Sequence, residues 1–321
     1  MTTARAVRIH ATGGPEVMAF EDVPLPAPGP GEALVRHEAV GLNFIDTYHR
    51  TGLYPVPLPS GLGTEGAGVV EAVGEGVDLR PGDRVAYAGG PLGAYATARV
   101  MPAAPLVRLP DDVSFEEGAA LMLKGLTTHY LFRRTTPIGP GDTVLFHAAA
   151  GGVGLLACQW ARADGVRLIA TAGTDEKCAM ALGHGAAHAV NSHDPDLVGA
   201  VRRLTDGRGV DVVMDGVGRD TFAASLDCLR PLGFMISFGN ASGKVPPFDI
   251  GTLAAKGSLK LTRPTLFAHT ADPATLRRMA QELFAMRLQV RVNQRFALGD
   301  VAEAHRALEG RQTTGSTVLA V

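Results

Sequence analysis

The chain has 321 residues, 46% of them hydrophobic, and its 30 Lys and Arg nearly balance 32 Asp and Glu for a formal net charge of −2. This length accommodates two domains with full cores, and the balanced charge gives no global electrostatic case for binding nucleic acid or an anionic membrane. No apolar run approaches the roughly 20 residues of a membrane helix, and the segment MTTARAVRIHATGG lacks the apolar block of a secretory signal. Cys158, Cys178 and Cys228 are odd in number and widely spaced, so we expect buried apolar thiols and a cytoplasmic protein.

The first 120 residues contain short apolar segments separated by Pro and Gly, which is typical of a compact β-rich domain. Strands are expected at residues 4–9, 33–40, 68–73 and 83–88. Ser114 is a candidate N-cap for a helix through residue 121, which begins the crossing into a second domain.

The next part of the chain alternates strand-like and helix-like segments. Strands are expected at residues 144–146, 166–171, 187–190, 210–215 and 233–239, and helices between them include 175–182 and 220–229. This alternation predicts parallel strands joined by right-handed crossovers, and therefore an α/β fold with a doubly wound sheet. After residue 265 we expect helix 273–286, strand 289–298, helix 301–308 and strand 316–320.

A glycine-rich turn, Ala149-Ala150-Gly151-Gly152-Val153-Gly154, follows the first strand of the alternating region. Two glycines let the backbone approach a dinucleotide pyrophosphate, and the last lets the following helix pack closely, with its free N–H groups facing the phosphates. The alternative is a tight turn without a ligand. Because strands and helices continue to alternate after the turn, we interpret it as a cofactor site, although Ala149 replaces the first glycine of the pattern.

Several motifs lie in order along the chain, at residues 42–48 (LNFIDTY), 63–70 (GTEGAGVV), 81–85 (PGDRV), 123–127 (LKGLT), 147–154 and 237–240 (SFGN). Together they resemble the medium-chain dehydrogenase/reductase superfamily and, within it, the zinc-free NADPH:quinone oxidoreductases that include zeta-crystallin. The resemblance implies a GroES-like catalytic domain over residues 1–122, a Rossmann domain over 123–264, and a segment 265–321 that completes the first domain. It also implies NADPH-dependent reduction of quinones.

The resemblance bears on the metal. Zinc-containing members of the superfamily carry a Cys and a His as catalytic ligands, and here the matching positions hold Asn43 and Thr64. Since catalytic zinc needs such ligands, we expect no metal. We expect His147, beside the glycine turn, to be packed or hydrogen-bonded. Without a Lewis acid to stabilise an alkoxide, the chemistry suits an acceptor that takes hydride readily, such as a quinone or an activated alkene.

The second strand of the predicted nucleotide domain ends at Gly173 and Thr174, where NAD-selective sites usually place an acidic side chain. These small residues leave room for the 2′-phosphate of NADPH, which Lys177 can reach. The alternative is that Asp175 binds the ribose and Lys177 is solvated. In the family a Tyr often follows the third strand, and Ser192 stands there instead.

By resemblance, the candidate catalytic residues are Asn43, Asp46, Tyr48 and Tyr54. Asn43 and Tyr48 have donors for a quinone or enone oxygen, and the ring of Tyr54 can stack on a flat acceptor. The alternative is that the tyrosines only pack. Lys124 either approaches the cleft or is solvated. The resemblance assigns cofactor contacts to Phe44, Tyr130, Gly151, Gly152, Val153, Gly154, Gly173, Thr174, Lys177, Ser192, Val217, Phe238, Gly239, Asn240, Pro264, Thr265, Leu266 and Arg311.

Two other functions stay open at this point. One is reduction of α,β-unsaturated aldehydes or ketones with NADPH, and the other is a non-enzymatic, crystallin-like or RNA-binding role. The near-neutral charge argues against RNA as the main ligand. Residues 257–263 alternate in polarity as an edge strand does, and family members pair this edge with a second copy, so we expect a homodimer.

Overall fold

The computed structural model describes residues 3–321, which divide into two compact units. The first unit holds the described residues up to Leu126 together with Thr270–Ala285 and Val290–Val321, and the second holds Thr127–His269 and Met286–Gln289. The chain passes between the units at 126/127 and 269/270, and again at 285/286 and 289/290. The boundaries that the resemblance implied lie at 122/123 and 264/265. Within residues 3–321, no helix combines the length and the apolar character needed to cross a lipid bilayer.

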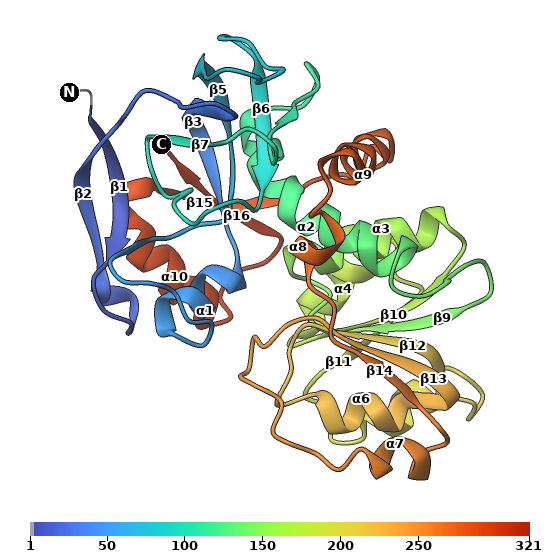
Figure 1. Ribbon diagram of the computed structural model, residues 1–321. Helices are drawn as coiled ribbons and strands as arrows, with labels where there is room; N and C mark the ends of the chain where they lie inside the picture. Colours follow the sequence, from blue (N-terminus) through green and yellow to red (C-terminus); the bar gives the residue numbers. More distant parts are fainter. Residues whose placement is uncertain (1–2) are drawn as a thin grey trace. The chain divides into compact units, whose positions relative to one another are not determined.

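The first unit is built mainly from antiparallel strands (Figure 1). A three-stranded sheet has the order β2-β1-β4, with β1 Thr3–Ile9, β2 Met18–Pro24 and β4 Ser60–Gly61. The larger sheet has the order β15-β16-β3-β5-β6-β8, and β7 also pairs with β3. Its strands are β3 Glu32–Leu42, β5 Glu65–Val73, β6 Arg84–Ala88, β7 Ala98–Pro102, β8 Val107–Arg108, β15 Val292–Ala297 and β16 Ser316–Ala320.

Because β16 pairs with β3, the end of the chain is part of this larger sheet. The apolar core of the unit includes Val35, Val85 and Leu319, which are fully buried. Short helical segments complete the unit: η1 Pro15–Val17, α1 Phe44–Thr51, the beginning of α2 Phe115–Arg133, α9 Pro273–Ala285, η2 Leu298–Asp300 and α10 Val301–Glu309.

Two helices of this unit begin at side-chain caps. At the start of α2, Ser114 Oγ accepts the N–H of Glu117 at 3.2 Å, and the Glu117 carboxylate accepts the N–H of Ser114 at 2.9 Å, which confirms the predicted N-cap. Helix α1 was not expected from the sequence. It begins after Asn43, whose N–H donates to the carboxylate of Asp46 at 2.9 Å.

The second unit contains a sheet of parallel strands in the order β11-β10-β9-β12-β13-β14 (Figure 1). This order is typical of a dinucleotide-binding doubly wound sheet, in which the ligand crevice lies where the order reverses, here between β9 and β12. The predicted α/β fold with a doubly wound sheet is confirmed. The strands are β9 Thr143–Phe146, β10 Arg167–Ala172, β11 His188–Asn191, β12 Val210–Asp215, β13 Leu229–Ser237 and β14 Lys260–Thr262.

Helices cover both faces of this sheet. α3 (Gly152–Ala163) contacts α4 (Asp175–Gly183), and α5 (Leu197–Arg203) contacts α6 (Phe222–Cys228). In Figure 1, α3 and α6 lie on opposite faces of the sheet. The short helices α7 (Gly251–Ala255) and α8 (Leu266–His269) precede and follow β14. As expected, all three cysteines are buried and free.

Candidate functional site

One edge of the parallel sheet gathers most of the proposed cofactor contacts. Because the strands are parallel, their carboxyl ends lie at the same edge. A proposed residue follows each of these ends, and the six are Gly151 after β9, Gly173 after β10, Ser192 after β11, Val217 after β12, Phe238 after β13 and Pro264 after β14. The fold therefore brings together residues that are far apart in the sequence.

The glycine turn between β9 and α3 leaves no room for a side chain at its last glycine. Gly151 is the N-cap of α3, and Gly152 and Val153 form its half-buried first turn. A Cβ at Gly154 would stand 2.4 Å from the Cα of Ala149 and 2.5 Å from its carbonyl oxygen. The helix thus starts directly against the backbone of the turn, which is the close approach that the glycine pattern predicts.

A buried polar network joins the ends of β9 and β12. The ring of His147 pairs through Nδ1 with Thr171 Oγ1 at 2.9 Å and through Nε2 with Ser225 Oγ at 3.0 Å. Ser225 donates to Asp215 Oδ2 at 3.0 Å, and Asp215 Oδ1 accepts the N–H of Val217 at 2.7 Å. Burial lowers the pKa of His147, although the charge of Asp215 opposes the shift. His147 is therefore hydrogen-bonded, as expected.

Sequence analysis missed Asp215 and Ser225. The signal for Asp215 was present, because this carboxylate follows the apolar run Val212–Met214 at the carboxyl end of a strand, where folds of this type place their ligands. Ser225 lies in α6, the helix that follows β12, and no pattern in the sequence links it to His147. Together these side chains fix the loop that carries Val217.

The end of β10 carries the residues proposed to select NADPH. Nothing lies closer than 3.6 Å to a Cβ built on Gly173, so the backbone is open there. Thr174 is exposed and caps α4, since its Oγ1 accepts the N–H of Lys177 at 3.2 Å. Asp175, the alternative ribose ligand, accepts a hydrogen bond from Asn191 Nδ2 at 2.9 Å. Lys177 thus belongs to the first turn of α4, and the Asp175 carboxylate is held against the end of β11.

The loops after β12 and β13 approach each other closely. A Cβ at Gly239 would stand 2.2 Å from the carbonyl oxygen of Gly216, so only glycine fits there. The ring of Phe238 lies 5.8 Å from that of Phe146, and the adjacent Asn240 is half-buried.

The remaining proposed cofactor residues divide between the units. Tyr130 of α2 belongs to the second unit and stacks on His269, with ring centroids 4.6 Å apart and an interplanar angle of 7°. After β14, Thr265 is exposed and Leu266 is buried. Phe44 and Arg311 belong to the first unit, so the sheet edge described above does not include them.

In the first unit, Asn43 and Thr64 each donate to a buried carboxylate. Asn43 Nδ2 donates to Glu65 Oε2 at 2.8 Å, and Thr64 Oγ1 donates to Asp46 Oδ1 at 3.2 Å. These are the two residues that the resemblance places at zinc-ligand positions, and in the structure both side chains donate to protein carboxylates. Lys124 is buried rather than solvated, and its Nζ pairs with Glu65 Oε2 at 3.1 Å.

The carboxyl group of Asp46 is fully buried and accepts three hydrogen bonds. Tyr95 Oη and the Asn43 N–H donate to Oδ2 at 2.8 and 2.9 Å, and Thr64 donates to Oδ1. Burial raises the pKa of Asp46 to about 7, and the charge of Glu65 adds to the rise, while the three hydrogen bonds oppose it. Asp46 therefore changes its protonation state near neutral pH.

Three aromatic side chains gather at α1. The ring of Tyr48 lies 6.4 Å from that of Phe44 and 5.1 Å, edge-on, from that of Tyr54. The N–H of Tyr54 donates to the carbonyl of Tyr48 at 3.0 Å, which holds the loop after α1 against the helix. The two tyrosine rings pack against each other, and the roles proposed for the Tyr48 hydroxyl and for the Tyr54 ring stay predictions.

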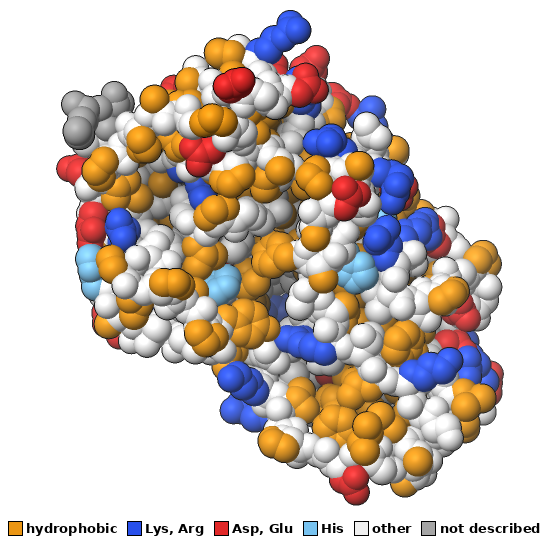
Figure 2. Space-filling model, viewed as in Figure 1, with side chains coloured by type: hydrophobic (Ala, Val, Ile, Leu, Met, Phe, Trp, Pro, Cys, Tyr) orange, Lys and Arg blue, Asp and Glu red, His pale blue; other side chains and the backbone are white. Residues whose placement is uncertain are grey.

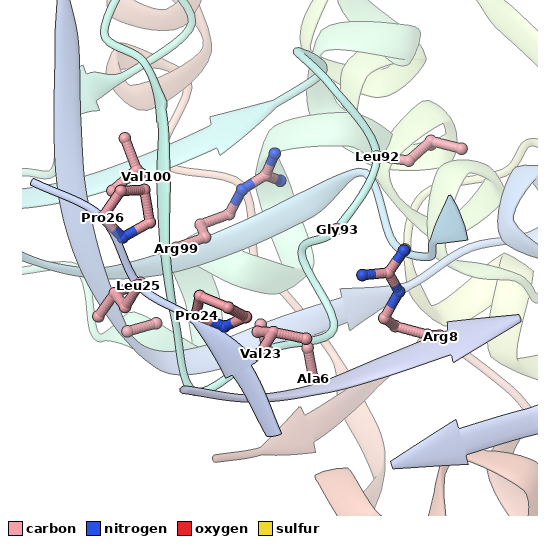
Figure 3. A pocket seen from close by; sticks show the side chains of 13 residues that line it. Ala6, Arg8, Val23, Pro24, Leu25, Pro26, Leu92, Gly93, Arg99 and Val100 are labelled. Atoms are coloured by element: carbon pink, nitrogen blue, oxygen red, sulfur yellow. The ribbon is translucent and has the colours of Figure 1, made fainter. Parts of the chain in front are cut away.

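A cavity of about 290 Å³ in the first unit lies apart from these residues, between β1, the end of β2 and the segment that leads into β7 (Figure 3). Arg8 and Arg99 line it together with mainly small and apolar residues, and none of its lining residues is a proposed site residue. In the described part of the chain, no group of three or more His, Cys, Asp or Glu side chains is arranged to hold a metal ion.

Two family models match the chain. The model described as the alcohol dehydrogenase GroES-like domain covers residues 29–111, and the model described as zinc-binding dehydrogenase covers residues 152–283. The first match lies in the first unit, and the second covers the second unit from α3 onward and extends into α9 of the first unit.

Relatives match over the full length. The quinone oxidoreductase of Pseudomonas aeruginosa is 53% identical over 98% of this chain and 99% of its own. The 2-haloacrylate reductase of a Burkholderia species is 43% identical over 98% of both chains. Among solved structures, Escherichia coli quinone oxidoreductase complexed with NADPH matches with a TM-score of 0.97 at 47% identity, covering 99% of this chain and 100% of that chain.

Proposed function

The chain belongs to the quinone oxidoreductase family of the medium-chain dehydrogenase/reductase superfamily, and we propose that it reduces quinones by hydride transfer from NADPH without zinc. The proposal rests mainly on one observation: a proposed cofactor-binding residue follows the carboxyl end of each strand of the parallel sheet. The turn after β9 adds a helix start with free N–H groups, which favours a pyrophosphate there.

The cofactor is NADPH rather than NADH in this proposal. Gly173 leaves open backbone at the end of β10, and Lys177 supplies a positive charge in the helical turn that follows. Asp175, which would favour the ribose of NADH, is already engaged by Asn191. The E. coli relative was solved with NADPH bound, which supports the same choice.

When bound, NADPH supplies the hydride. Reduction of a quinone takes up this hydride and one proton, so the products are the hydroquinone and NADP⁺. One amide N–H of Asn43 is directed to Glu65, and the other is the proposed donor to the quinone oxygen, together with the hydroxyl of Tyr48. These donors would stabilise the negative charge that develops on the oxygen, and the Tyr54 ring would stack on the flat acceptor.

A second candidate function is the reduction of activated alkenes, because the Burkholderia relative is a 2-haloacrylate reductase. Initial rates with NADPH should be compared for 1,4-naphthoquinone, phenanthrenequinone, a 2-alkenal and 2-chloroacrylate. The proposal predicts that kcat/KM is highest for the quinones. The reverse order would favour alkene reduction, and NADPH binding without oxidation by any acceptor would indicate a non-enzymatic role.

We further propose a cytoplasmic homodimer that pairs through β14. This strand ends the sheet path of the second unit. Leu232 of the neighbouring β13 is exposed, and so are Phe248 and Ile250 in the segment between β13 and β14. On the face shown in Figure 2, apolar side chains gather over α6 and α7. Pairing would cover the open edge. Sedimentation at micromolar concentration should give twice the chain mass, and a monomer alone would contradict this.

A further inference from the structure

Behind Asp46, a series of hydrogen bonds runs through the first unit to an ion pair at its surface. Tyr95 Oη lies 2.8 Å from Asp46 Oδ2 and 3.2 Å from His305 Nε2. His305 Nδ1 lies 2.9 Å from Nη1 of Arg50, whose guanidinium also binds both oxygens of Glu309, at 2.9 and 2.7 Å. The first four side chains are buried, whereas that of Glu309 is 35% exposed.

The direction of each hydrogen bond follows from the chemistry of its partners. Arg50 can only donate, so His305 Nδ1 accepts and the ring proton sits on Nε2. That N–H donates to Tyr95 Oη, and the hydroxyl proton of Tyr95 is directed to Asp46. Burial and the charge of Arg50 lower the pKa of His305 to about 3, so the ring stays neutral. All the hydrogen bonds between Arg50 and Asp46 therefore point toward the carboxyl group.

We propose that Tyr95 and His305 are positioning residues of the reductase site, which hold the Asp46 carboxyl group and control its affinity for a proton. Hydrogen bonds aligned in one direction polarise each other, so the Tyr95 hydroxyl is a stronger donor to a carboxylate than an isolated tyrosine. The inference rests on the proposed function, because that proposal gives a substrate-binding role to Asn43, whose N–H donates to Asp46.

Charged or titratable groups lie around Asp46 on five elements. They are Arg50 of α1, Glu65 at the start of β5, Tyr95 in the segment before β7, Lys124 of α2 and His305 of α10. Glu65 opposes ionisation of Asp46, but its own charge is paired with Lys124. Arg50 acts on Asp46 through His305 and Tyr95. Burial makes the largest contribution to the proton affinity of Asp46, and the Tyr95 hydroxyl is the strongest of the hydrogen-bond donors that oppose it.

The protonation state of Asp46 also sets the direction of the Thr64 hydroxyl. Ionised Asp46 accepts the Thr64 O–H at Oδ1. Because Oδ2 already accepts two hydrogen bonds, an added proton sits on Oδ1 and donates to Thr64 Oγ1, which turns the hydroxyl hydrogen of Thr64 toward another acceptor. Thr64 stands at the position of a zinc ligand in other members of the superfamily, so control of Asp46 extends to the reacting side of the site.

Tyr95→Phe tests the proposal, with Tyr87→Phe as the matched control. Tyr87 is also fully buried, and its hydroxyl pairs with His37 Nε2 at 2.8 Å, so the control likewise loses a buried Tyr–His hydrogen bond. The readout is the infrared carbonyl band of the protonated carboxyl group, followed against pH in the full chain and assigned by its loss in Asp46→Asn. Since a hydrogen bond to a charged group and one pKa unit have similar free energies, Tyr95→Phe should raise the midpoint by about one pH unit, and Tyr87→Phe should leave it unchanged.

His305→Leu provides a second variant, which leaves Arg50 paired with Glu309. It should raise the midpoint by less than Tyr95→Phe does, and it should add nothing in the Tyr95→Phe background, because His305 acts through Tyr95. The pH profile of kcat for naphthoquinone reduction should move in the same direction. An unmoved infrared midpoint in Tyr95→Phe, or an equal shift in Tyr87→Phe, would overturn the inference.

If the infrared midpoint shifts but the pH profile of kcat does not, Tyr95 and His305 have no role in the reaction, and the proposal that they are positioning residues of the reductase site is wrong. The infrared titration needs no substrate, so its result does not depend on whether the proposed function is correct. A chain that reduces no quinone would contradict the proposed function, whereas the infrared result alone shows whether Tyr95 and His305 act on Asp46.

Discussion

Gly154 and Ala149 are in closer contact than any side chain at position 154 would allow, because a Cβ there would stand 2.4 Å from the Cα of Ala149. The start of α3 is therefore placed by backbone packing, and the N–H groups of its first turn owe their position to this contact. In the proposed function these groups bind the pyrophosphate, so the contact links the packing of the fold to cofactor binding.

Gly154→Ala should lower both stability and NADPH affinity. Overpacking of this kind costs about 1–3 kcal/mol, and α3 has to shift to relieve it. Gly183→Ala is the control, because a Cβ on that helical glycine meets nothing within 4 Å, and Ala is favoured over Gly in a helix. Urea denaturation and fluorescence titration with NADPH measure the two effects. Unchanged values for Gly154→Ala would show that the contact does not place the helix.

Lys177→Ala should weaken NADPH binding while leaving NADH binding nearly unchanged. A hydrogen bond to a charged phosphate contributes about 1.5–3 kcal/mol, so the KM for NADPH should rise roughly tenfold or more. Asp175→Asn distinguishes the two alternatives at the end of β10, in which either Lys177 binds the 2′-phosphate of NADPH or Asp175 binds the ribose. It should leave the NADPH/NADH preference unchanged, and a selective loss of NADH binding in Asp175→Asn would instead assign the ribose to Asp175.

Asp46 makes stability depend on pH in a defined direction. Its pKa rises from 3.8 to about 7 on folding, mainly through burial, so the folded state holds the proton more tightly than the unfolded chain. The stabilisation is fully present below about pH 4 and is lost as the pH rises to about 7, by up to about 4 kcal/mol. The difference in unfolding free energy between the unmodified chain and Asp46→Asn should fall over this range.

Asp272 supplies the control for this titration. Hydrogen bonds from Thr275 lower the pKa of Asp272, so Asp272→Asn should not remove the loss of stability between pH 4 and 7. Urea denaturation at intervals across this range measures all three proteins. A pH-independent difference between the unmodified chain and Asp46→Asn would show that Asp46 is ionised throughout.

Tyr48→Phe tests the proposed donor to the quinone oxygen. Removing one donor to a developing oxyanion lowers kcat by about 10²–10³ when the donor acts in the transition state. The edge-on contact between the rings of Tyr48 and Tyr54 is kept in this variant, so the packing of the aromatic group is preserved. Full quinone reductase activity in Tyr48→Phe would limit Tyr48 to a packing role, with Tyr54→Phe as the comparison that removes the other hydroxyl.

The sequence predicted the parallel sheet well because its strands are short apolar segments with clear boundaries. In this sheet β12 begins and ends where the pattern indicated, whereas β13 spans Leu229–Ser237 and was expected at 233–239. In the first unit β16 also has the expected bounds. Helices α4 and α10 each differ from expectation by one residue. Helix α1 was missed because it has only eight residues and follows the buried strand β3 directly, so its periodicity is too short to stand out.

The polar interactions behind the site were beyond the reach of sequence patterns. Arg50 and His305 are separated by 255 positions, and the pairing of β16 with β3 together with the packing of α10 into the core of the first unit brings them together. Lys124 looked like a solvated residue or a cleft residue, and its burial against Glu65 depends on the packing of α2 on β5. Motifs therefore located the site, whereas its hydrogen-bond partners required the folded structure.

The most direct test of the proposed function is a single turnover of the chelator-treated, NADPH-loaded full chain with 1,4-naphthoquinone in the absence of oxygen, combined with elemental analysis of the same sample. We predict that NADPH oxidation and hydroquinone formation occur in equal amounts and at the same rate before and after chelation, with less than stoichiometric zinc. Two results would contradict the proposed function. One is the presence of one tightly bound zinc per chain together with loss of activity when chelation removes it, and the other is NADPH that the quinone does not oxidise.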